Sequence, residues 1–124
     1  MLQKIADALN DGARPIKGSR ILLLGVTYKA DVADTRESPS LEVLRQLAQR
    51  GADVRYCDPH IPMQELDDDI YESAPWSAEE VAAADLVVML TAHREFLEER
   101  HWEGARLVVD TRNVIPRARH VFSI

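Results

Sequence analysis

Five charged side chains and a tyrosine follow the aliphatic run at residues 21–24, before the chain reaches its next apolar pattern. Lys29 offers a point charge, and Arg36 offers a planar fork that binds a phosphate or a carboxylate through two hydrogen bonds. The ring of Tyr28 could stack on a sugar or a base, and Asp34 could brace either cation. These residue types fit recognition of an anionic ligand by side chains. The alternative is a solvated segment whose two basic and three acidic side chains pair with one another.

The same segment lacks the glycine motifs that bind phosphates through backbone N–H groups. A dinucleotide-binding turn needs the pattern G-x-G-x-x-G, and only Gly25 is present. A P-loop needs a glycine–lysine–serine ending, which is also missing. Any phosphate at this position must therefore be held mainly by side chains.

A second candidate cation, Arg112, follows the apolar run at 106–110 and stands close to Asp110 and Asn113. One interpretation is a further cation for the same ligand. The other is a strand-end arginine that pairs with Asp110. Spacing alone does not choose between the two.

The remaining reactive residue types give weaker signals. The histidines do not have metal-ligand spacing, and they are His60, His93, His101 and His120. We expect His93 to cap or orient other groups. Cys57 lies inside a predicted strand with no base nearby, so we expect a buried, inert thiol. No catalytic residue and no metal site are predicted.

Strands and helices alternate along the chain and would position these residues. Apolar runs predict strands at 21–26, 53–57, 84–91 and 106–110, with an edge strand at 120–122. One helix should begin at Ser38-Pro39, and another should be capped by Ser77 with Glu80 three residues on. Apolar spacing also predicts an opening helix, which we expect to have little core to pack on. The acidic stretch 63–73 reads as a loop with one short strand at 70–72.

This alternation predicts an α/β fold, a Rossmann-like three-layer domain with a parallel sheet of five or six strands and helices on both faces. In such sheets, ligands bind outside the carboxyl ends of the strands. The polar residues that follow each strand should therefore converge on one edge, although they lie far apart in the sequence.

Composition argues against three classes of protein. With 124 residues and one cysteine, the chain is one domain without an internal disulfide framework. Its net charge of −6 argues against a general nucleic-acid binder. No apolar stretch approaches the ~20 residues of a membrane helix, and residues 1–17 lack the pattern of a secretory signal. We expect a cytoplasmic protein that binds neither nucleic acid nor membrane.

The stretch 25–62 resembles the carboxy-terminal domain of the UDP-glucose/GDP-mannose dehydrogenase family. The matching signature is Gly-x-x-Tyr-Lys, then Asp-x-Arg-x-Ser-Pro, then Gly-Ala and a Tyr-x-Asp-Pro turn. The segments "LTAH" (90–93) and "VVDTRNV" (108–114) extend the similarity over nearly the whole chain. These two segments resemble the branch that oxidises UDP-N-acetylhexosamines more than UDP-glucose dehydrogenase proper.

Enzymes of that family use NAD to oxidise the C6 alcohol of a nucleotide sugar to a carboxylate. The resemblance implies that Tyr28 and Lys29 contact the UDP-sugar and that Arg36 reaches NAD across an interdomain cleft. It also implies that Arg112 contacts the substrate, in some members from the neighbouring subunit. The family's catalytic cysteine lies in a central region, and Cys57 does not match it.

The resemblance further implies that residues 1–17 are the end of a connecting helix and linker, and that residues 18–124 are the UDP-sugar-binding carboxy-terminal domain. NAD would then be bound mainly by a domain that this chain lacks, and the chain alone would be inactive. The expected partners are a UDP-sugar and the NAD-binding and central domains of a full-length, homodimeric enzyme. The alternative is a stand-alone Rossmann-like nucleotide-binding or regulatory module. The sequence does not fix which nucleotide sugar is used.

Overall fold

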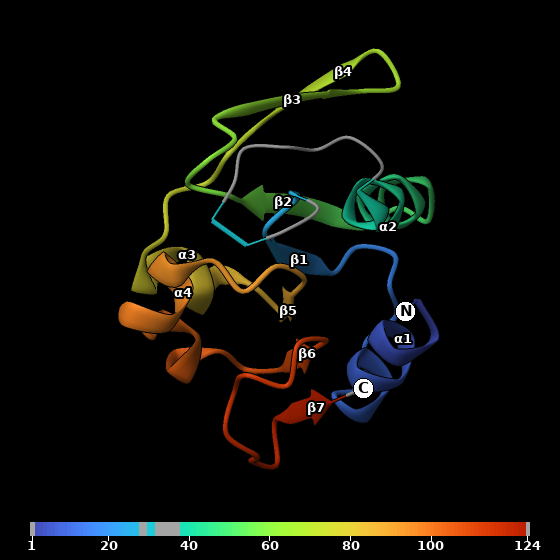
Figure 1. Cartoon of the computed structure of the whole chain (residues 1–124). Coiled ribbons are helices and arrows are strands. Elements are labelled where there is room, and N and C mark those ends of the chain that lie inside the picture. Colours follow the sequence, from blue (N-terminus) through green and yellow to red (C-terminus); the bar gives the residue numbers. More distant parts are fainter. Residues whose placement is uncertain (1, 28–29, 32–37, 124) are drawn as a thin grey trace.

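The computed structural model describes residues 2–27, 30–31 and 38–123, in which helices surround one central sheet (Figure 1). The helical elements are α1 (Leu2–Asp11), α2 (Pro39–Gln49), α3 (Ala78–Ala83), α4 (Arg94–Glu98) and the 3-10 turn η1 (His101–Gly104). The strands are β1 (Arg20–Leu24), β2 (Asp53–Cys57), β3 (Met63–Leu66), β4 (Asp69–Glu72), β5 (Leu86–Met89), β6 (Val108–Asp110) and β7 (Val121–Ser123). The main sheet has the order β2-β1-β5-β6-β7, and β3 pairs with β4 separately.

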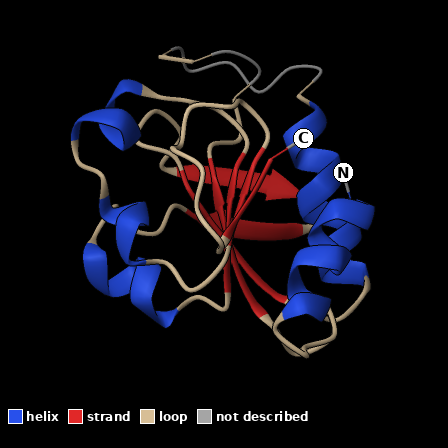
Figure 2. Ribbon diagram, turned by 90° about the horizontal axis from the view of Figure 1, so that it is seen from below, coloured by secondary structure: helices blue, strands red, loops and turns tan. Residues whose placement is uncertain are grey.

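Neighbouring strands of the main sheet are all parallel, and helices cover both of its faces (Figure 2). The α/β, Rossmann-like three-layer prediction is therefore confirmed, with five strands in the sheet. The chain runs from β1 outward to β2 and then returns to place β5 on the other side of β1. This reversal is the switch point at which doubly wound sheets bind ligands, outside the carboxyl ends of the strands.

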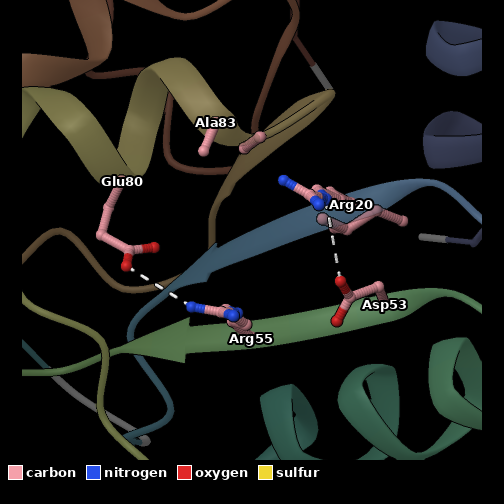
Figure 3. Close-up of a pocket in the computed structure, with 7 residues that line it drawn as sticks. Arg20, Asp53, Arg55, Glu80 and Ala83 are labelled. Carbon is pink, nitrogen blue, oxygen red and sulfur yellow. Dashed lines mark hydrogen bonds and ion pairs between the residues drawn. The ribbon is translucent and has the colours of Figure 1, made fainter.

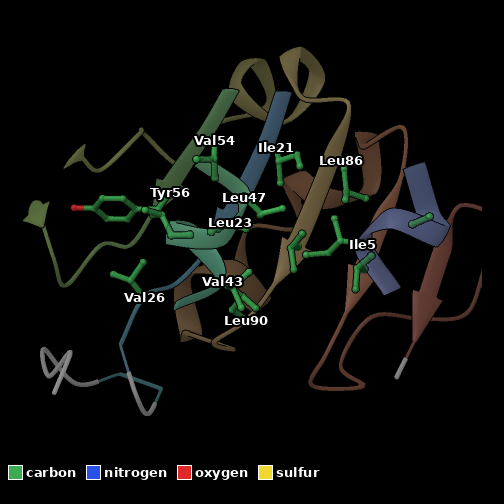
Figure 4. Packing of buried hydrophobic residues seen from close by; sticks show 14 of the residues in the cluster. Ile5, Ile21, Leu23, Val26, Val43, Leu47, Val54, Tyr56, Leu86 and Leu90 are labelled. Atoms are coloured by element: carbon green, nitrogen blue, oxygen red, sulfur yellow. The ribbon is translucent and has the colours of Figure 1, made fainter. Parts of the chain in front are cut away.

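Side chains of the buried strands alternate between two hydrophobic clusters. In β1, Ile21 and Leu23 join a cluster with residues of α1 and α2 (Figure 4), whereas Leu22 and Leu24 join a cluster with residues of α3, α4 and η1. None of these four side chains is more than 2% exposed. Because β1 is buried on both faces, polar residues are found before and after this strand in the sequence and not within it.

Helix α1 is a full part of the core, so the expectation that it has little to pack on is wrong. Its residues Ile5, Ala8 and Leu9 are completely buried. They belong to the same cluster as Leu107 and Phe122. The helical spacing was readable in the sequence, but these partners lie about a hundred positions away.

Strands β3 and β4 form an antiparallel hairpin where the sequence predicted a loop with a single short strand. The two turn residues, Asp67 and Asp68, have φ of 51° and 68°, as a type I′ turn requires. Leu66 and Tyr71 pack against the main core. The acidic run hid this hairpin because aspartate is a less common choice than glycine or asparagine for two successive left-handed residues.

Both predicted helix starts are confirmed, although their serines act differently. Ser77 accepts a hydrogen bond from the N–H of Glu80 (3.2 Å) and caps α3. Ser38 precedes Pro39 at the start of α2, but its hydroxyl donates to the carbonyl of Val26 (2.7 Å). This bond ties the beginning of α2 to the segment that leaves β1.

The described helices are short, with at most 11 residues. None of them is long and apolar enough to cross a membrane.

Candidate functional site

The carboxyl edge of the sheet gathers polar residues from the ends of four strands. Thr27 follows β1, Asp58 follows β2, His93 follows β5 and Arg112 follows β6. The Nε2 atom of His93 lies 3.0 Å from both Thr27 Oγ1 and Asp58 Oδ2. Arg112 Nε donates to the carbonyl of Leu90 (2.8 Å), just beyond β5. The predicted convergence is therefore confirmed for these residues.

Three of the predicted site residues, Tyr28, Lys29 and Arg36, lie outside the described residues, as does Asp34. Their meeting with Arg112 at a common rim stays a prediction. The described chain on either side of them shows how the crossover from β1 to α2 is attached to the rest of the domain.

Asp58 anchors the chain as it leaves β1. This residue is 1% exposed. Its Oδ2 accepts the N–H groups of Val26 (2.9 Å) and Thr27 (3.3 Å), and its Oδ1 accepts the N–H of His60 (2.8 Å). Burial would raise the pKa of the Asp58 carboxyl, but the hydrogen bonds from His93, Val26 and His60 outweigh it and hold that pKa below its ordinary value.

The position of this carboxylate reverses the arrangement of a dinucleotide-binding sheet. There, backbone N–H groups after the first strand bind a pyrophosphate, and a downstream acidic side chain binds a ribose. Here the acidic residue at the end of β2 takes the N–H groups after β1 for itself. Asp58 therefore accepts the backbone N–H groups that would otherwise donate to the phosphate of a dinucleotide.

Close packing at Gly25 also fills the switch point, the place at the carboxyl ends of β1 and β5 where a ligand would otherwise fit. Its φ is +94°, and a Cβ built on it would lie 2.5 Å from the Cβ of Thr91. The hydroxyl of Thr91 donates to the carbonyl of Thr27 (2.9 Å). Glycine is therefore required here for the close approach of β5's end, and the space beside it is taken by Thr91.

His93 is completely buried and uses both ring nitrogens. Nδ1 accepts the backbone N–H of Asp31 (2.8 Å), so this atom carries no proton. The proton is then on Nε2, which donates to Asp58 Oδ2. These contacts fit the expected capping or orienting role.

Asp31 forms a reciprocal pair of bonds with the start of α4. Its own N–H donates to His93, and its Oδ1 accepts the N–H of Arg94 (2.8 Å). Asp31 has a φ of 60°, a left-handed conformation that aspartate tolerates better than most residues. Asp31 is thereby bonded to the first residue of α4, more than sixty positions later in the sequence.

Asp110 and Arg112 do not form the ion pair that one interpretation predicted. Asp110 is completely buried, and its two oxygens accept the N–H groups of Arg112 (3.0 Å) and Ile115 (2.7 Å). Within residues 2–27, 30–31 and 38–123, no carboxylate forms a salt bridge with the Arg112 guanidinium. The other interpretation, a cation that binds a ligand, stays a prediction.

Asp31, His60 and His93 bring potential metal ligands within 4.8 Å of one another. The rings of His60 and His93 lie 4.6 Å apart, a contact that sequence reasoning missed. Both histidines follow strands that flank β1, and this shared position was the available signal. A cation would have to displace the Asp31 N–H from His93, so we assign no metal to this cluster.

Cys57 is buried, as predicted. Burial, with a smaller effect of the neighbouring Asp58, raises the pKa of its thiol to about 12. The thiol is therefore protonated at neutral pH and poorly suited to act as a nucleophile.

The described surface has hollows at both edges of the sheet. A cavity of about 120 Å³ lies at the amino edge, where Arg55 faces Glu80 and Arg20 faces Asp53 (Figure 3). A hollow of about 300 Å³ lies beside Asp58 at the carboxyl edge. Its lining includes three prolines and an indole, and the residues are Cys57, Asp58, Pro59, Pro62, Ser73, Ala74, Pro75 and Trp76. Only the second hollow adjoins the converging polar residues.

Comparison with known proteins gives consistent matches. Residues 22–117 match the sequence model of the UDP-glucose/GDP-mannose dehydrogenase family, UDP binding domain. The chain is 32% identical over 108 residues to a UDP-N-acetyl-D-mannosamine dehydrogenase of Methanococcus vannielii, covering 81% of this chain and 24% of that protein. It is 34% identical over 125 residues to a UDP-glucose 6-dehydrogenase of Rickettsia felis, covering 93% of this chain and 27% of that protein.

Among solved structures, the UDP-D-ManNAc dehydrogenase from Pyrococcus horikoshii has the same fold over 99% of this chain and 29% of its own, with a TM-score of 0.80 and 24% identity. The chain thus spans about a quarter of the length of the relatives that it matches.

Proposed function

The chain belongs to the UDP-glucose/GDP-mannose dehydrogenase family, as the resemblance in its sequence indicated, and from this premise we propose that its carboxyl edge binds the nucleotide part of a UDP-sugar. In a full-length enzyme, this domain would close over the substrate of an NAD-dependent 6-dehydrogenase, which oxidises the sugar C6 alcohol to a carboxylate. Relatives named for UDP-N-acetyl-D-mannosamine and for UDP-glucose are both similar to it. A UDP-N-acetylhexosamine is the first substrate to test.

The observation that carries this proposal is the state of Arg112. Its Nε is held by the carbonyl of Leu90 (2.8 Å), so the guanidinium is fixed at the carboxyl edge while the residue stays exposed. Asp110 forms no salt bridge with it, and the two oxygens of that carboxylate accept the backbone N–H groups of Arg112 and Ile115. Within the described residues, no carboxylate forms a salt bridge with this guanidinium, and a guanidinium held in place is well suited to bind a phosphate. Tyr28 and Lys29 would supply the other contacts to the UDP-sugar.

The filled switch point supports a primary NAD site on another domain. Asp58 takes the backbone N–H groups that a pyrophosphate would need, and Thr91 takes the space beside Gly25. NAD would be bound mainly by the domain that precedes this one in the family, with Arg36 reaching it across the cleft. NAD supplies the oxidising chemistry when bound there, and this chain's part is to hold the substrate.

The chain by itself is proposed to be inactive. Its Cys57 has a pKa of about 12 and lies in the core, so it cannot serve as the thiolate of the reaction. Residues 1–17 would be the end of a connecting helix that docks on the 18–124 domain, consistent with the buried residues of α1. The full-length protein is proposed to be a cytoplasmic homodimer.

A titration with UDP, followed by NMR, tests the proposal on this chain. We expect a dissociation constant near 1 mM, because this domain alone supplies only part of the contacts that a full-length enzyme would make with the ligand. Arg112→Ala should weaken the response about tenfold, a loss of about 1.4 kcal/mol. Arg55→Ala, which removes a cation from the amino edge, is the matched control and should leave UDP affinity unchanged.

Two results would contradict the proposal. One is an equal loss of UDP affinity in Arg112→Ala and Arg55→Ala, which would mean that UDP responds only to the overall positive charge of the chain. The other is turnover of a UDP-sugar with NAD by the 124-residue chain alone. Micromolar or tighter binding of UDP by the chain would instead favour a stand-alone nucleotide-binding module.

A further inference from the structure

The turn that follows β6 is bonded to the end of β5 at two successive carbonyl groups. The carbonyl of Met89 accepts hydrogen bonds from the hydroxyl of Thr111 (2.6 Å) and from its N–H (3.2 Å). The next carbonyl, that of Leu90, accepts a hydrogen bond from Nε of Arg112 (2.8 Å). The backbone of the turn and the guanidinium that it carries are therefore attached to the same strand end.

A single buried carboxylate closes this turn. Asp110 is completely buried, and its Oδ1 accepts the N–H of Arg112 (3.0 Å) while its Oδ2 accepts the N–H of Ile115 (2.7 Å). Ile115 is 5% exposed and packs in the cluster that contains residues of α3 and α4. Asn113, between the two bonded residues, has a left-handed φ of 58°, which asparagine tolerates. Asp110 thus holds both the start and the end of the turn.

We propose that Asp110 and Thr111 are positioning residues for the guanidinium of Arg112. They fix the backbone at position 112 where Nε reaches the Leu90 carbonyl, and so they direct the terminal N–H groups of the guanidinium to a phosphate of the UDP-sugar. The inference rests on the proposed function, because it takes Arg112 to be a contact to the ligand. Neither Asp110 nor Thr111 touches the ligand. Holding the guanidinium in place before the ligand arrives reduces the conformational freedom that is lost on binding.

The bond to Leu90 leaves the end of the guanidinium for a ligand. Nε is used by the carbonyl, and the two terminal nitrogens still carry four N–H groups that can make parallel bonds to a phosphate. A carbonyl is a neutral partner, so it orients the cation without pairing it with an anion. The Nε atoms of four other arginines instead lie 2.7 to 3.9 Å from a carboxylate oxygen, and they are Arg20, Arg45, Arg94 and Arg100.

Comparison with Asp85 separates positioning from the closing of a turn. Asp85 is 9% exposed, and its Oδ2 accepts the N–H of Arg20 (2.9 Å), as Asp110 accepts that of Arg112. The Arg20 side chain is nevertheless 64% exposed, and its guanidinium comes only within 3.9 Å of Asp53. A buried aspartate below an arginine therefore does not by itself hold the side chain. At Arg112 the backbone is fixed from β6 and the guanidinium from β5.

Four substitutions test this role. Asp110→Asn keeps the shape of the side chain but replaces one oxygen by an NH₂ group, so one of two backbone N–H groups loses its acceptor. Thr111→Val removes the hydroxyl that bonds to Met89, and Thr111→Ser keeps that hydroxyl. Asp85→Asn makes the same carboxylate-to-amide change under an arginine at the amino edge, and it is the matched control.

The test combines three measurements on the chain: UDP affinity by NMR titration, the free energy of unfolding by urea denaturation, and hydrogen exchange of the Arg112 Nε–H by nitrogen NMR. We expect faster exchange at Nε in Asp110→Asn and Thr111→Val, with UDP affinity lower by about fivefold and about threefold. Thr111→Ser should match wild type in both measurements. Asp85→Asn should lower stability and leave both unchanged.

Double variants show whether these residues act through Arg112. If they do, adding Asp110→Asn or Thr111→Val to Arg112→Ala should cause no further loss of UDP affinity. Further losses equal to those in the wild-type background would overturn the proposal. It would also be overturned if a folded Asp110→Asn chain kept wild-type UDP affinity, or if Asp85→Asn lowered that affinity as much as Asp110→Asn. Should Asp110→Asn not fold, Thr111→Val in both backgrounds decides by the same criteria.

The failure of the proposed function is distinguishable from the failure of this inference. If UDP does not perturb the wild-type chain, the UDP-binding function fails, and the positioning role falls with it. If Arg112→Ala weakens UDP binding while the folded Asp110 and Thr111 variants bind UDP like wild type, only the positioning role fails.

Discussion

The two edges of the sheet use their charged residues in different proportions. At the carboxyl edge, Asp58 and Asp110 are at most 1% exposed, and they accept backbone N–H groups at 2.7 to 3.3 Å. At the amino edge, Arg55 and Glu80 lie 3.5 Å apart, with the arginine side chain 62% exposed. The guanidinium of Arg20 comes only within 3.9 Å of Asp53. Asp85, which is 9% exposed, accepts the backbone N–H of Arg20 at 2.9 Å and is the exception at this edge.

This difference separates charged groups that determine the path of the backbone from those that contribute little to stability. A buried carboxylate that accepts backbone N–H groups fixes where the backbone goes, and removing it leaves those donors unpaired. An exposed ion pair is solvated in either state and contributes little. Among the described residues, the carboxyl edge has more backbone N–H groups bound to buried carboxylates than the amino edge, where Asp85 accepts that of Arg20. The carboxyl edge is the one to which we assign the ligand.

The largest expected effect is that of Asp58→Ala. The change leaves buried donors on Val26, His60 and His93 without their acceptor. We expect a loss of about 3–5 kcal/mol in the free energy of unfolding, measured by urea denaturation. Asp53→Ala at the amino edge is the matched control and should change it by less than about 0.5 kcal/mol. Equal losses at Asp58 and Asp53 would remove the distinction between the edges.

Gly25→Ala should have the next largest effect. The new methyl group would meet Thr91 at 2.5 Å on a backbone with φ of +94°. Overpacking costs about 1–3 kcal/mol, and the left-handed backbone adds roughly 1–2 kcal/mol. Gly18, before β1, has φ of +83° with nothing within 4 Å, so Gly18→Ala isolates the backbone contribution. Urea denaturation should show Gly25→Ala to be the more destabilising by the overpacking cost.

The fold was largely readable from the sequence because it rests on local patterns. The aliphatic run of β1 and the Ser77–Glu80 capping box specify their elements within a few residues. Helix α1 and the β3–β4 hairpin were misjudged for different reasons. The partners of α1 lie at the other end of the chain, and the hairpin turn uses two aspartates where glycine or asparagine would have been a clearer signal.

The candidate site was readable only in outline. Parallel strands have their carboxyl ends at the same edge of a sheet, and this placed Asp58, His93 and Arg112 together. It did not show that His93 would bond to Asp31, or that Asp58 would take the N–H of Val26. Those bonds join residues more than thirty positions apart, and their geometry is fixed only when the whole sheet assembles.

Acid should weaken the carboxyl edge selectively. The pKa of Asp58 is below its ordinary value in the folded chain, so its ionised form stabilises folding at neutral pH. That contribution is present above the unfolded-state pKa and is lost as the pH falls through the folded-state value. The stability difference between wild type and Asp58→Asn should therefore shrink between about pH 5 and pH 2. A difference that stays constant over this range would contradict the assignment.

The smallest expected effect is at the Arg55–Glu80 pair, which lines the amino-edge cavity of Figure 3. A double-mutant cycle with Arg55→Ala and Glu80→Ala should give a coupling below about 0.5 kcal/mol, because the arginine is well solvated. Raising the salt concentration should reduce even this value, since exposed charges are screened. A coupling well above 1 kcal/mol that persists in high salt would mean that these charges are held as firmly as Asp58. The amino edge would then be a built site in its own right, and the reason for assigning the ligand to the opposite edge would be lost.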